Sequence, residues 1–256
     1  MPKDKHSGVY FEVAGEGPNL VLAFPFLASA GAVLGPDFEA LRQRYLAALV
    51  PRFRVLCLDY PSIGRSDAID PAALTADRVC SDMLSVAVAA GFDRFAWWGY
   101  SWGGAVGLQL GWRSDRLTAL VAGGWPALGG QYADMLAASR EQQADPPPEV
   151  QVILRSPAQY AQWATFYESV QQWPEAEAAR QLQCPRLCYA GADGDTTAGA
   201  YAIRNASILR EQQPVLASLG WQVELLPGCT HETGLDPDAV LPVVMPFLER
   251  ALIDEH

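Results

Sequence analysis

Residues 95–112 read FAWWGYSWGGAVGLQLGW, and this stretch decides the fold. The apolar run 95–98 predicts a short buried strand, and 102–112 has the length and spacing of a helix. Between them lies Gly-Tyr-Ser-Trp-Gly at 99–103. A sharp turn from strand to helix would expose the hydroxyl of Ser101, and the flanking glycines would prevent collisions across the turn. The sequence therefore predicts Ser101 as a nucleophile.

Short apolar strands alternate with helices on both sides of this stretch. Strands are expected at 9–13, 19–24, 53–58, 117–122, 185–190 and 222–226, and helices at 38–50, 76–90, 201–219 and 237–252, the last interrupted by Pro242 and Pro246. This order predicts an α/β fold whose mostly parallel, twisted sheet has helices on both faces.

Residues 125–183 depart from the alternation, because they contain helical segments and no convincing strand. We therefore expect a core formed by 1–124 and 184–256, with 125–183 as a helical lid or cap. An insertion at this point would lie above the ends of the strands, where ligands bind in such folds.

Composition excludes several classes of function. The chain has 256 residues and a net charge of −11, of which −1 falls in 1–124 and −10 in 125–256. Its two lysines, Lys3 and Lys5, lie at the N-terminus, so a nucleic-acid partner is not expected. No run of 18 or more apolar residues occurs, so a membrane span is not expected either.

The cysteines and histidines argue against a metal site. Five cysteines form no C-x-x-C pair, and only three histidines are available, so no metal or other cofactor is expected. We interpret the cysteines as reduced core residues of a cytoplasmic protein. The start, MPKDKHSGVY, lacks the apolar run of a signal peptide.

The base that would activate Ser101 can be chosen by elimination. His6 lies in the N-terminal segment and His256 is the last residue, so only His231 belongs to the body of the fold. It follows the strand expected at 222–226 by a short loop. A base within reach of a serine hydroxyl is typically worth about 10²–10⁴ in rate.

Three segments together resemble the α/β-hydrolase fold superfamily, in its branch of capped serine hydrolases. Gly99 to Gly103 resembles that family's nucleophile elbow, and Gly228-Cys229-Thr230-His231 its G-x-x-H segment. Residues 59–66 are similar to its D-x-x-G-x-G-x-S segment, although Ser62 and Ile63 stand where glycine and histidine are common. The resemblance covers nearly the whole chain and implies a Ser-His-Asp triad.

The resemblance also implies where the triad acid lies. The family commonly places it in a G-x-x-D segment after the strand that precedes the histidine's strand. Here the chain reads Gly-Ala-Asp-Gly-Asp at 191–195, with an aspartate on each side of the expected position. We favour Asp195 over Asp193, because Thr196-Thr197 and the helix after it match the family's downstream register. Asp59 is expected to have a structural role. Glu232 is expected to be a solvated neighbour of His231.

An oxyanion hole in this fold needs two backbone N–H groups. One is expected from Trp102, and the other from the loop after the strand at 19–24, where Pro25 has no N–H and Phe26 is the candidate. Aromatic residues around the site suggest a small, largely apolar substrate. The expected substrate-binding residues are Phe24, Tyr100, Trp125, Trp163, Phe166 and Tyr167.

The sequence thus predicts a cofactor-free serine hydrolase of a small ester, thioester or lactone, with a small molecule as its partner. Two alternatives stay open. The same triad could serve a carbon–carbon bond hydrolase, hydroxynitrile lyase, haloperoxidase or acyltransferase, or the chain could be a low-turnover receptor. Dehalogenases and epoxide hydrolases of this fold need Asp at position 101, so we exclude them. The oligomeric state is not predicted.

Overall fold

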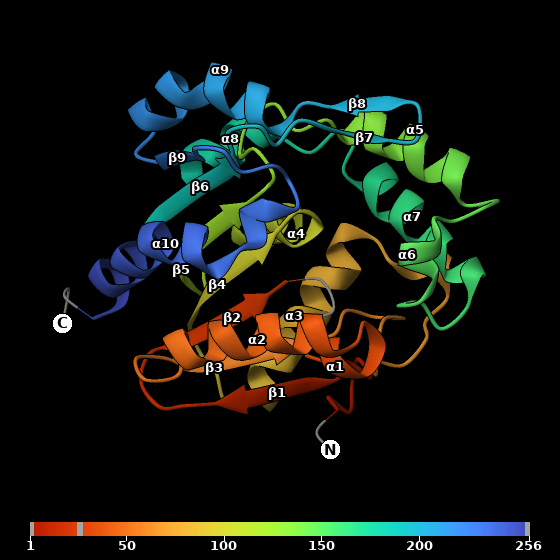
Figure 1. Cartoon of the computed structure of the whole chain (residues 1–256), viewed down its shortest axis with the longest axis horizontal. Coiled ribbons are helices and arrows are strands. Elements are labelled where there is room, and N and C mark those ends of the chain that lie inside the picture. Colours follow the sequence, from red (N-terminus) through yellow and green to blue (C-terminus); the bar gives the residue numbers. More distant parts are fainter. Residues whose placement is uncertain (1–2, 25–27, 254–256) are drawn as a thin grey trace.

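Seven strands form one sheet in the order β1-β3-β2-β4-β5-β6-β9, in a computed structural model that describes residues 3–24 and 28–253 (Figure 1). Only β1 is antiparallel to its neighbour. The strands are β1 (Phe11–Ala14), β2 (Asn19–Ala23), β3 (Arg54–Leu58), β4 (Phe95–Tyr100), β5 (Leu117–Gly123), β6 (Arg186–Gly191) and β9 (Gln222–Leu226). The predicted α/β architecture is therefore confirmed.

Helices cover both faces of the sheet, which explains why its strands are apolar on both sides. One face packs against α2 (Pro36–Leu49) and α10 (Pro237–Leu252). The other packs against α3 (Ala76–Ala89), α4 (Trp102–Arg113) and α9 (Asn205–Ser218). A short helix, α1 (Ala30–Val33), precedes α2.

Between β5 and β6 the described chain is helical. It forms α5 (Tyr132–Gln142), α6 (Pro148–Gln151), α7 (Ala161–Ser169) and α8 (Glu175–Gln181), with one 3₁₀ turn at Pro157–Tyr160. Figure 1 shows α5, α6 and α7 together on the right, beyond the carboxyl ends of the parallel strands. This segment is the one that we expect to act as a lid.

Two expectations about the C-terminal part are wrong. Residues 201–203 are not the start of a helix, because Thr196–Ala198 (β7) and Tyr201–Ile203 (β8) pair as an antiparallel hairpin and α9 begins only at Asn205. The turn of this hairpin contains Gly199 at φ 58°. In addition, α10 continues through Pro242 and Pro246, although each proline removes one N–H donor.

None of the helices in the described ranges is both long and apolar enough to cross a membrane. All five cysteines are free, and Cys57, Cys80, Cys188 and Cys229 are buried as expected.

Candidate active site

Ser101 lies at the turn between the central strand β4 and helix α4. Its backbone has φ 52° and ψ −121°, a left-handed conformation that is rare outside glycine. The Ser101 N–H donates to the Gly123 carbonyl at 2.8 Å, which fixes the turn against the neighbouring strand. A β-carbon at Gly99 would lie 2.0 Å from the Gly103 carbonyl oxygen, and one at Gly103 2.2 Å from that of Ala23. The glycine spacing of the motif is thus a steric requirement of this turn.

His231 meets Ser101 from the loop after β9. Its Nε2 lies 3.1 Å from the Ser101 Oγ, which is hydrogen-bonding distance. Burial lowers the pKa of His231 below the usual imidazole value, and the charge of Glu232 opposes this only in part. The imidazole is therefore neutral at pH 7, the state in which it can accept a proton.

Tyr100 holds the histidine loop in place. Its hydroxyl donates a hydrogen bond to the backbone carbonyl of His231. The Tyr100 side chain is fully buried and belongs to the core on the α2 and α10 face of the sheet. Tyr100 directly precedes Ser101 in the chain. It therefore connects the strand that leads to Ser101 with the loop that carries His231.

Within the described residues, no hydrogen bond joins His231 to Asp193 or Asp195. The carboxylate of Asp195 accepts hydrogen bonds from the Ser207 N–H at 2.9 Å and from its hydroxyl, in the first turn of α9. Burial would raise the pKa of Asp195, but these bonds lower it overall. Asp193 is exposed, and its backbone N–H donates to the Cys229 carbonyl at 2.9 Å. Asp193 is thereby tied to the loop that carries His231, while its carboxylate makes no hydrogen bond within the described residues.

The structure describes one of the two expected oxyanion donors, Trp102. Trp102 is the first residue of α4, so its N–H has no intrahelical acceptor and lies next to Ser101. Its indole ring packs edge-on against Phe166 at 5.2 Å between centroids. Phe26 lies outside the described residues.

A pocket of about 250 Å³ opens beside Ser101 and His231. Of the six predicted substrate-binding residues, Trp125 and Tyr167 line this pocket. The other four are not part of its lining. Phe24 and Tyr100 belong to the core on the α2 and α10 face, while Trp163 and Phe166 pack against Trp102.

Several lining residues are not among the sequence predictions. They are Met135 of α5, the hairpin residues Thr196, Thr197, Ala198 and Ile203, Asn205 of α9, and Glu232. Most of them come from the β7–β8 hairpin. This hairpin contacts the helical segment 125–183, which we call the cap, where Gln131 Nε2 donates to the Ala202 carbonyl at 3.0 Å. One sequence signal points to Glu232, which is its position directly after His231.

Asp59 has the structural role expected for it. Its carboxylate accepts hydrogen bonds from the backbone N–H groups of Ser29 at 3.0 Å and Arg65 at 2.9 Å. Burial raises the pKa of Asp59, and these bonds oppose that rise. The side chain therefore organises the loop after β3 and does not reach Ser101.

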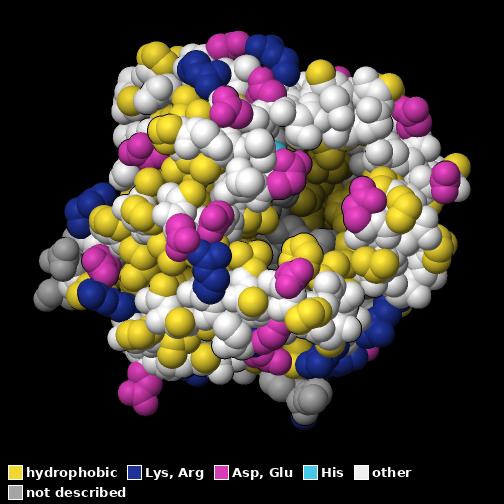
Figure 2. All heavy atoms as spheres, in the orientation of Figure 1, with side chains coloured by type: hydrophobic (Ala, Val, Ile, Leu, Met, Phe, Trp, Pro, Cys, Tyr) yellow, Lys and Arg dark blue, Asp and Glu magenta, His cyan; other side chains and the backbone are white. Residues whose placement is uncertain are grey.

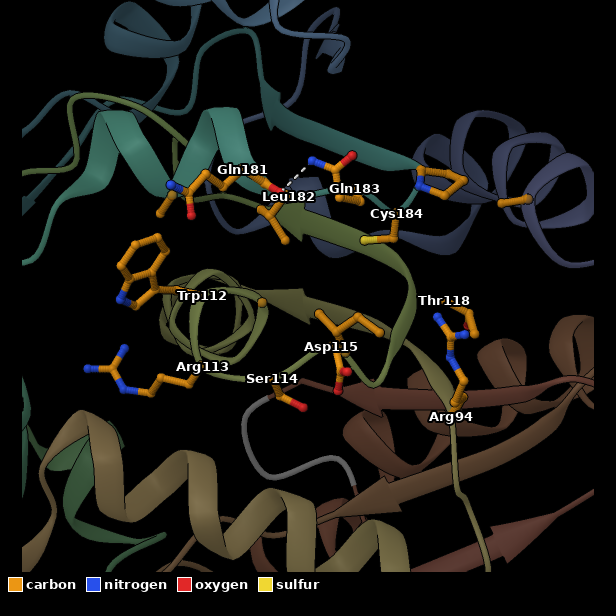
Figure 3. Close-up of a pocket in the computed structure, with 15 residues that line it drawn as sticks. Arg94, Trp112, Arg113, Ser114, Asp115, Thr118, Gln181, Leu182, Gln183 and Cys184 are labelled. Carbon is orange, nitrogen blue, oxygen red and sulfur yellow. Dashed lines mark hydrogen bonds between the residues drawn. The ribbon is translucent and has the colours of Figure 1, made fainter.

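A larger cavity of about 1120 Å³ lies elsewhere, around the C-terminal end of α4 (Figure 3). In Figure 3, Trp112, Arg113, Ser114 and Asp115 lie below, and Gln181, Leu182 and Gln183 lie above them. Neither Ser101 nor His231 lines it. The described residues also contain no group of three or more His, Cys, Asp or Glu side chains suited to a metal ion. The smaller pocket is thus the one whose wall contains both Ser101 and His231.

Curated relatives with similar sequences are hydrolases by name. The chain is 30% identical over 127 residues to the "Putative carbamate hydrolase RutD" of Yersinia enterocolitica, covering 48% of this chain and 43% of that protein. It is 31% identical over 97 residues to the pimeloyl-[acyl-carrier protein] methyl ester esterase of Pectobacterium carotovorum, covering 34% and 36%. The matched regions span less than half the length of these relatives.

Solved structures share the fold over almost the whole chain. A thermophilic esterase from Thermogutta terrifontis superposes with a TM-score of 0.70 at 18% identity, covering 95% of this chain and 94% of that one. The enol-lactonase from Burkholderia xenovorans gives 0.66 at 20% identity, covering 94% and 96%. The model of the alpha/beta hydrolase family matches residues 26–243. The family model thus matches most of the chain, and the chain has a mostly parallel sheet with helices on both faces. The chain therefore belongs to the alpha/beta hydrolase family.

Proposed function

We propose that this enzyme is a serine hydrolase that cleaves a small, largely apolar carboxylic ester, thioester or lactone. The observation that carries the proposal is the 3.1 Å approach of His231 Nε2 to Ser101 Oγ, in the wall of a pocket of about 250 Å³. This volume is below the ~300–1,000 Å³ of pockets for drug-sized ligands, which favours a small substrate.

The first half of the reaction forms an acyl-enzyme. Ser101 Oγ attacks the substrate carbonyl carbon while His231 Nε2 accepts the hydroxyl proton, which requires the tautomer with the proton on Nδ1. The negative charge that develops on the carbonyl oxygen is stabilised by the Trp102 N–H, with Phe26 as the proposed second donor. The tetrahedral intermediate then collapses, and His231 returns its proton to the leaving alcohol or thiol.

The second half releases the acid. A water molecule gives a proton to His231 and attacks the acyl carbon. Collapse of the second tetrahedral intermediate breaks the bond to Ser101 Oγ, which regains its proton from His231. The lowered pKa of His231 supports this cycle, because the histidine is neutral before each attack.

For the third member of the triad, the hydrogen bonds of the two aspartates favour Asp193 over Asp195. The carboxylate of Asp195 is engaged with Ser207, in the first turn of α9. Asp193 is tied to the histidine loop through its backbone and has a carboxylate free of hydrogen bonds among the described residues. A contact between this exposed carboxylate and the imidazole would orient the base as a triad acid does.

The relatives support acyl transfer to water as the reaction class. Their printed names include a carbamate hydrolase, a methyl ester esterase and an enol-lactonase. Carbamates, methyl esters and enol lactones all contain a carbonyl carbon bonded to oxygen or nitrogen, which a serine hydroxyl can attack. The arrangement of Ser101 and His231 suits that step.

The test is a series of chromogenic esters with acyl chains of increasing length, assayed with the wild type, Ser101→Ala and His231→Gln. We expect turnover of short-chain esters that falls by at least about 10³-fold in either variant. Ser218→Ala is the matched control, because Ser218 is exposed at the end of α9. Undiminished turnover in Ser101→Ala, or a folded wild type that cleaves no ester of the series, would overturn the proposal.

A further inference from the structure

The pocket beside Ser101 carries one negative charge and no positive one. Its lining contains a single carboxylate, that of Glu232, and no Lys or Arg side chain among the residues that the structure describes. The remaining lining groups carry no charge, and burial keeps His231 neutral. A substrate with a negative group would therefore meet uncompensated repulsion in this pocket.

The carboxylate of Glu232 is not neutralised by a neighbour. It accepts a hydrogen bond from the Thr230 hydroxyl at 2.8 Å. No ion pair within residues 3–24 and 28–253 includes it. Hydrogen bonds from its own backbone N–H and from Thr230 lower its pKa, so it is ionised at neutral pH. Glu232 is thus available as the counter-charge of a bound cation.

Two aromatic rings share the wall of the same pocket. Trp125 and Tyr167 both line it, and their rings stack with centroids 6.1 Å apart at an angle of 27°. Aromatic rings attract a cation that lies within about 6 Å of a ring face, and the attraction increases when water is excluded. Both side chains are only 2% exposed. Aromatic walls with one carboxylate form a suitable environment for an ammonium group.

The surface around the site has the same sign. Figure 2 shows a deep hollow with hydrophobic walls in the region of α5, α7 and the β7–β8 hairpin. Acidic side chains lie on its rim, while the Lys and Arg side chains of this face lie away from it. The sequence places −10 of the net charge of −11 in residues 125–256, the part that forms most of this wall. The field at the opening thus favours the approach of cations.

From these observations we infer that the substrate is a small ester or thioester that carries an ammonium group, with Glu232 as the residue that selects it and with Trp125 and Tyr167 as the aromatic wall beside the cation. This inference rests on the proposed function, since the ester would be cleaved at Ser101. It adds the charge of the substrate and a specificity residue.

The test compares three thioacetates that release their thiols for direct detection. One is the thioacetate of thiocholine, one is its uncharged isostere with tert-butyl in place of trimethylammonium, and one is the thioacetate of mercaptoacetate. For the wild type we expect kcat/KM for the cationic ester to exceed that for the neutral isostere by about fivefold or more, and the anionic ester to be the poorest. In Glu232→Gln the ratio of cationic to neutral ester should fall by about threefold to fivefold. Salt should lower the ratio of the wild type.

Glu16→Gln is the matched control, because it removes one exposed carboxylate in the turn between β1 and β2, far from the pocket. It should leave the ratio unchanged, whereas Glu232→Asp should retain part of the preference. Equal kcat/KM for the cationic and neutral esters in the wild type, or a ratio that Glu232→Gln does not lower, would overturn the inference while leaving ester hydrolysis in place. If Ser101→Ala cleaves the neutral ester as well as the wild type, the proposed function itself fails.

Discussion

At Ser101 the backbone is held in a conformation that side chains normally avoid. Among the described residues, Ser62 and Ser101 are the two non-glycine positions with positive φ, at 64° and 52°. Such a conformation costs about 1–3 kcal/mol and persists only when its surroundings determine it. Ser62 stands where the resembled segment commonly has glycine, and it adopts a glycine-like conformation. At Ser101 the strain presents the hydroxyl to the pocket and to His231.

Tyr100→Phe tests whether the phenol positions the base. The substitution leaves the His231 carbonyl without its donor inside the core, which should cost about 1–3 kcal/mol of unfolding free energy. A displaced imidazole should lower kcat severalfold with little change in KM, since Tyr100 does not line the pocket. Ester kinetics and urea unfolding measure the two effects.

Tyr189→Phe is the control, because the Tyr189 side chain is also buried but its hydroxyl accepts from Trp98 Nε1 at 3.3 Å. Within the described residues it makes no hydrogen bond to His231. It should lower stability and leave kcat near that of the wild type. Equal kcat losses in both variants would show that Tyr100 acts only through stability.

The pH dependence of activity reports on His231. Burial lowers its folded pKa below the ordinary imidazole value of about 6.5, so the neutral base persists as the pH falls through that value. The acid limb of the kcat/KM profile should therefore bend below about pH 6.5. Because the charge of Glu232 raises the pKa of His231, Glu232→Gln should move the bend to lower pH. A bend above 6.5, or a shift to higher pH in the variant, would contradict the assignment of His231 as the buried base.

At the scale of elements, the segment between β6 and α9 has two roles. It lines the pocket, and it supports the first turn of α9. Its hairpin contributes Thr196, Thr197, Ala198 and Ile203 to the pocket wall. Asp195, just before the hairpin, satisfies an N–H of the first turn of α9. Helix starts favour carboxylates because the first N–H groups have no intrahelical acceptor. This short segment therefore links the wall of the pocket to the stability of helix α9.

Asp195 and Asp193 should separate when each is changed to alanine. Asp195→Ala removes the acceptor of the Ser207 N–H and should lower unfolding free energy by about 0.5–2 kcal/mol, measured by urea denaturation. Asp193→Ala should leave stability nearly unchanged and lower kcat/KM more than Asp195→Ala does, since only Asp193 retains a free carboxylate beside the histidine loop. The reverse order of activity losses, at equal stability, would return the triad role to Asp195.

At the scale of the whole molecule, the sheet could be predicted because its signals are long and repeated. Both faces of the five central strands β2 to β6 are buried, so these strands appear as apolar runs that alternate with helical segments. The choice of His231 needed only the count of three histidines. The β7–β8 hairpin was missed because its strands have three residues each, too few for a periodic pattern. The residues Thr196, Thr197, Ala198 and Ile203 of the pocket wall were missed with it.

Tyr100 is absent from the pocket lining because of the face of β4 on which it lies. Side chains of a strand alternate between faces, and Tyr100 shares the face of Trp98, which packs toward α2 and α10. The pocket is formed instead by the cap, the hairpin and the histidine loop. Tyr100 could therefore have been assigned to the core by counting along β4. The positions of Trp125 and Tyr167 depend on how the cap folds over the sheet, which local patterns do not specify.

The central claim is that Ser101 is a nucleophile activated by His231, and covalent labelling tests it most directly. The folded protein is incubated with a fluorophosphonate, digested with trypsin and analysed by mass spectrometry. The tryptic peptide Phe95–Arg113 contains Ser101 as its one serine, so fragment ions locate the adduct without ambiguity. We expect one phosphonyl group per chain on Ser101, formed at a much lower rate in His231→Gln. A folded protein that remains unlabelled at Ser101, or that is labelled equally fast in His231→Gln, would contradict it.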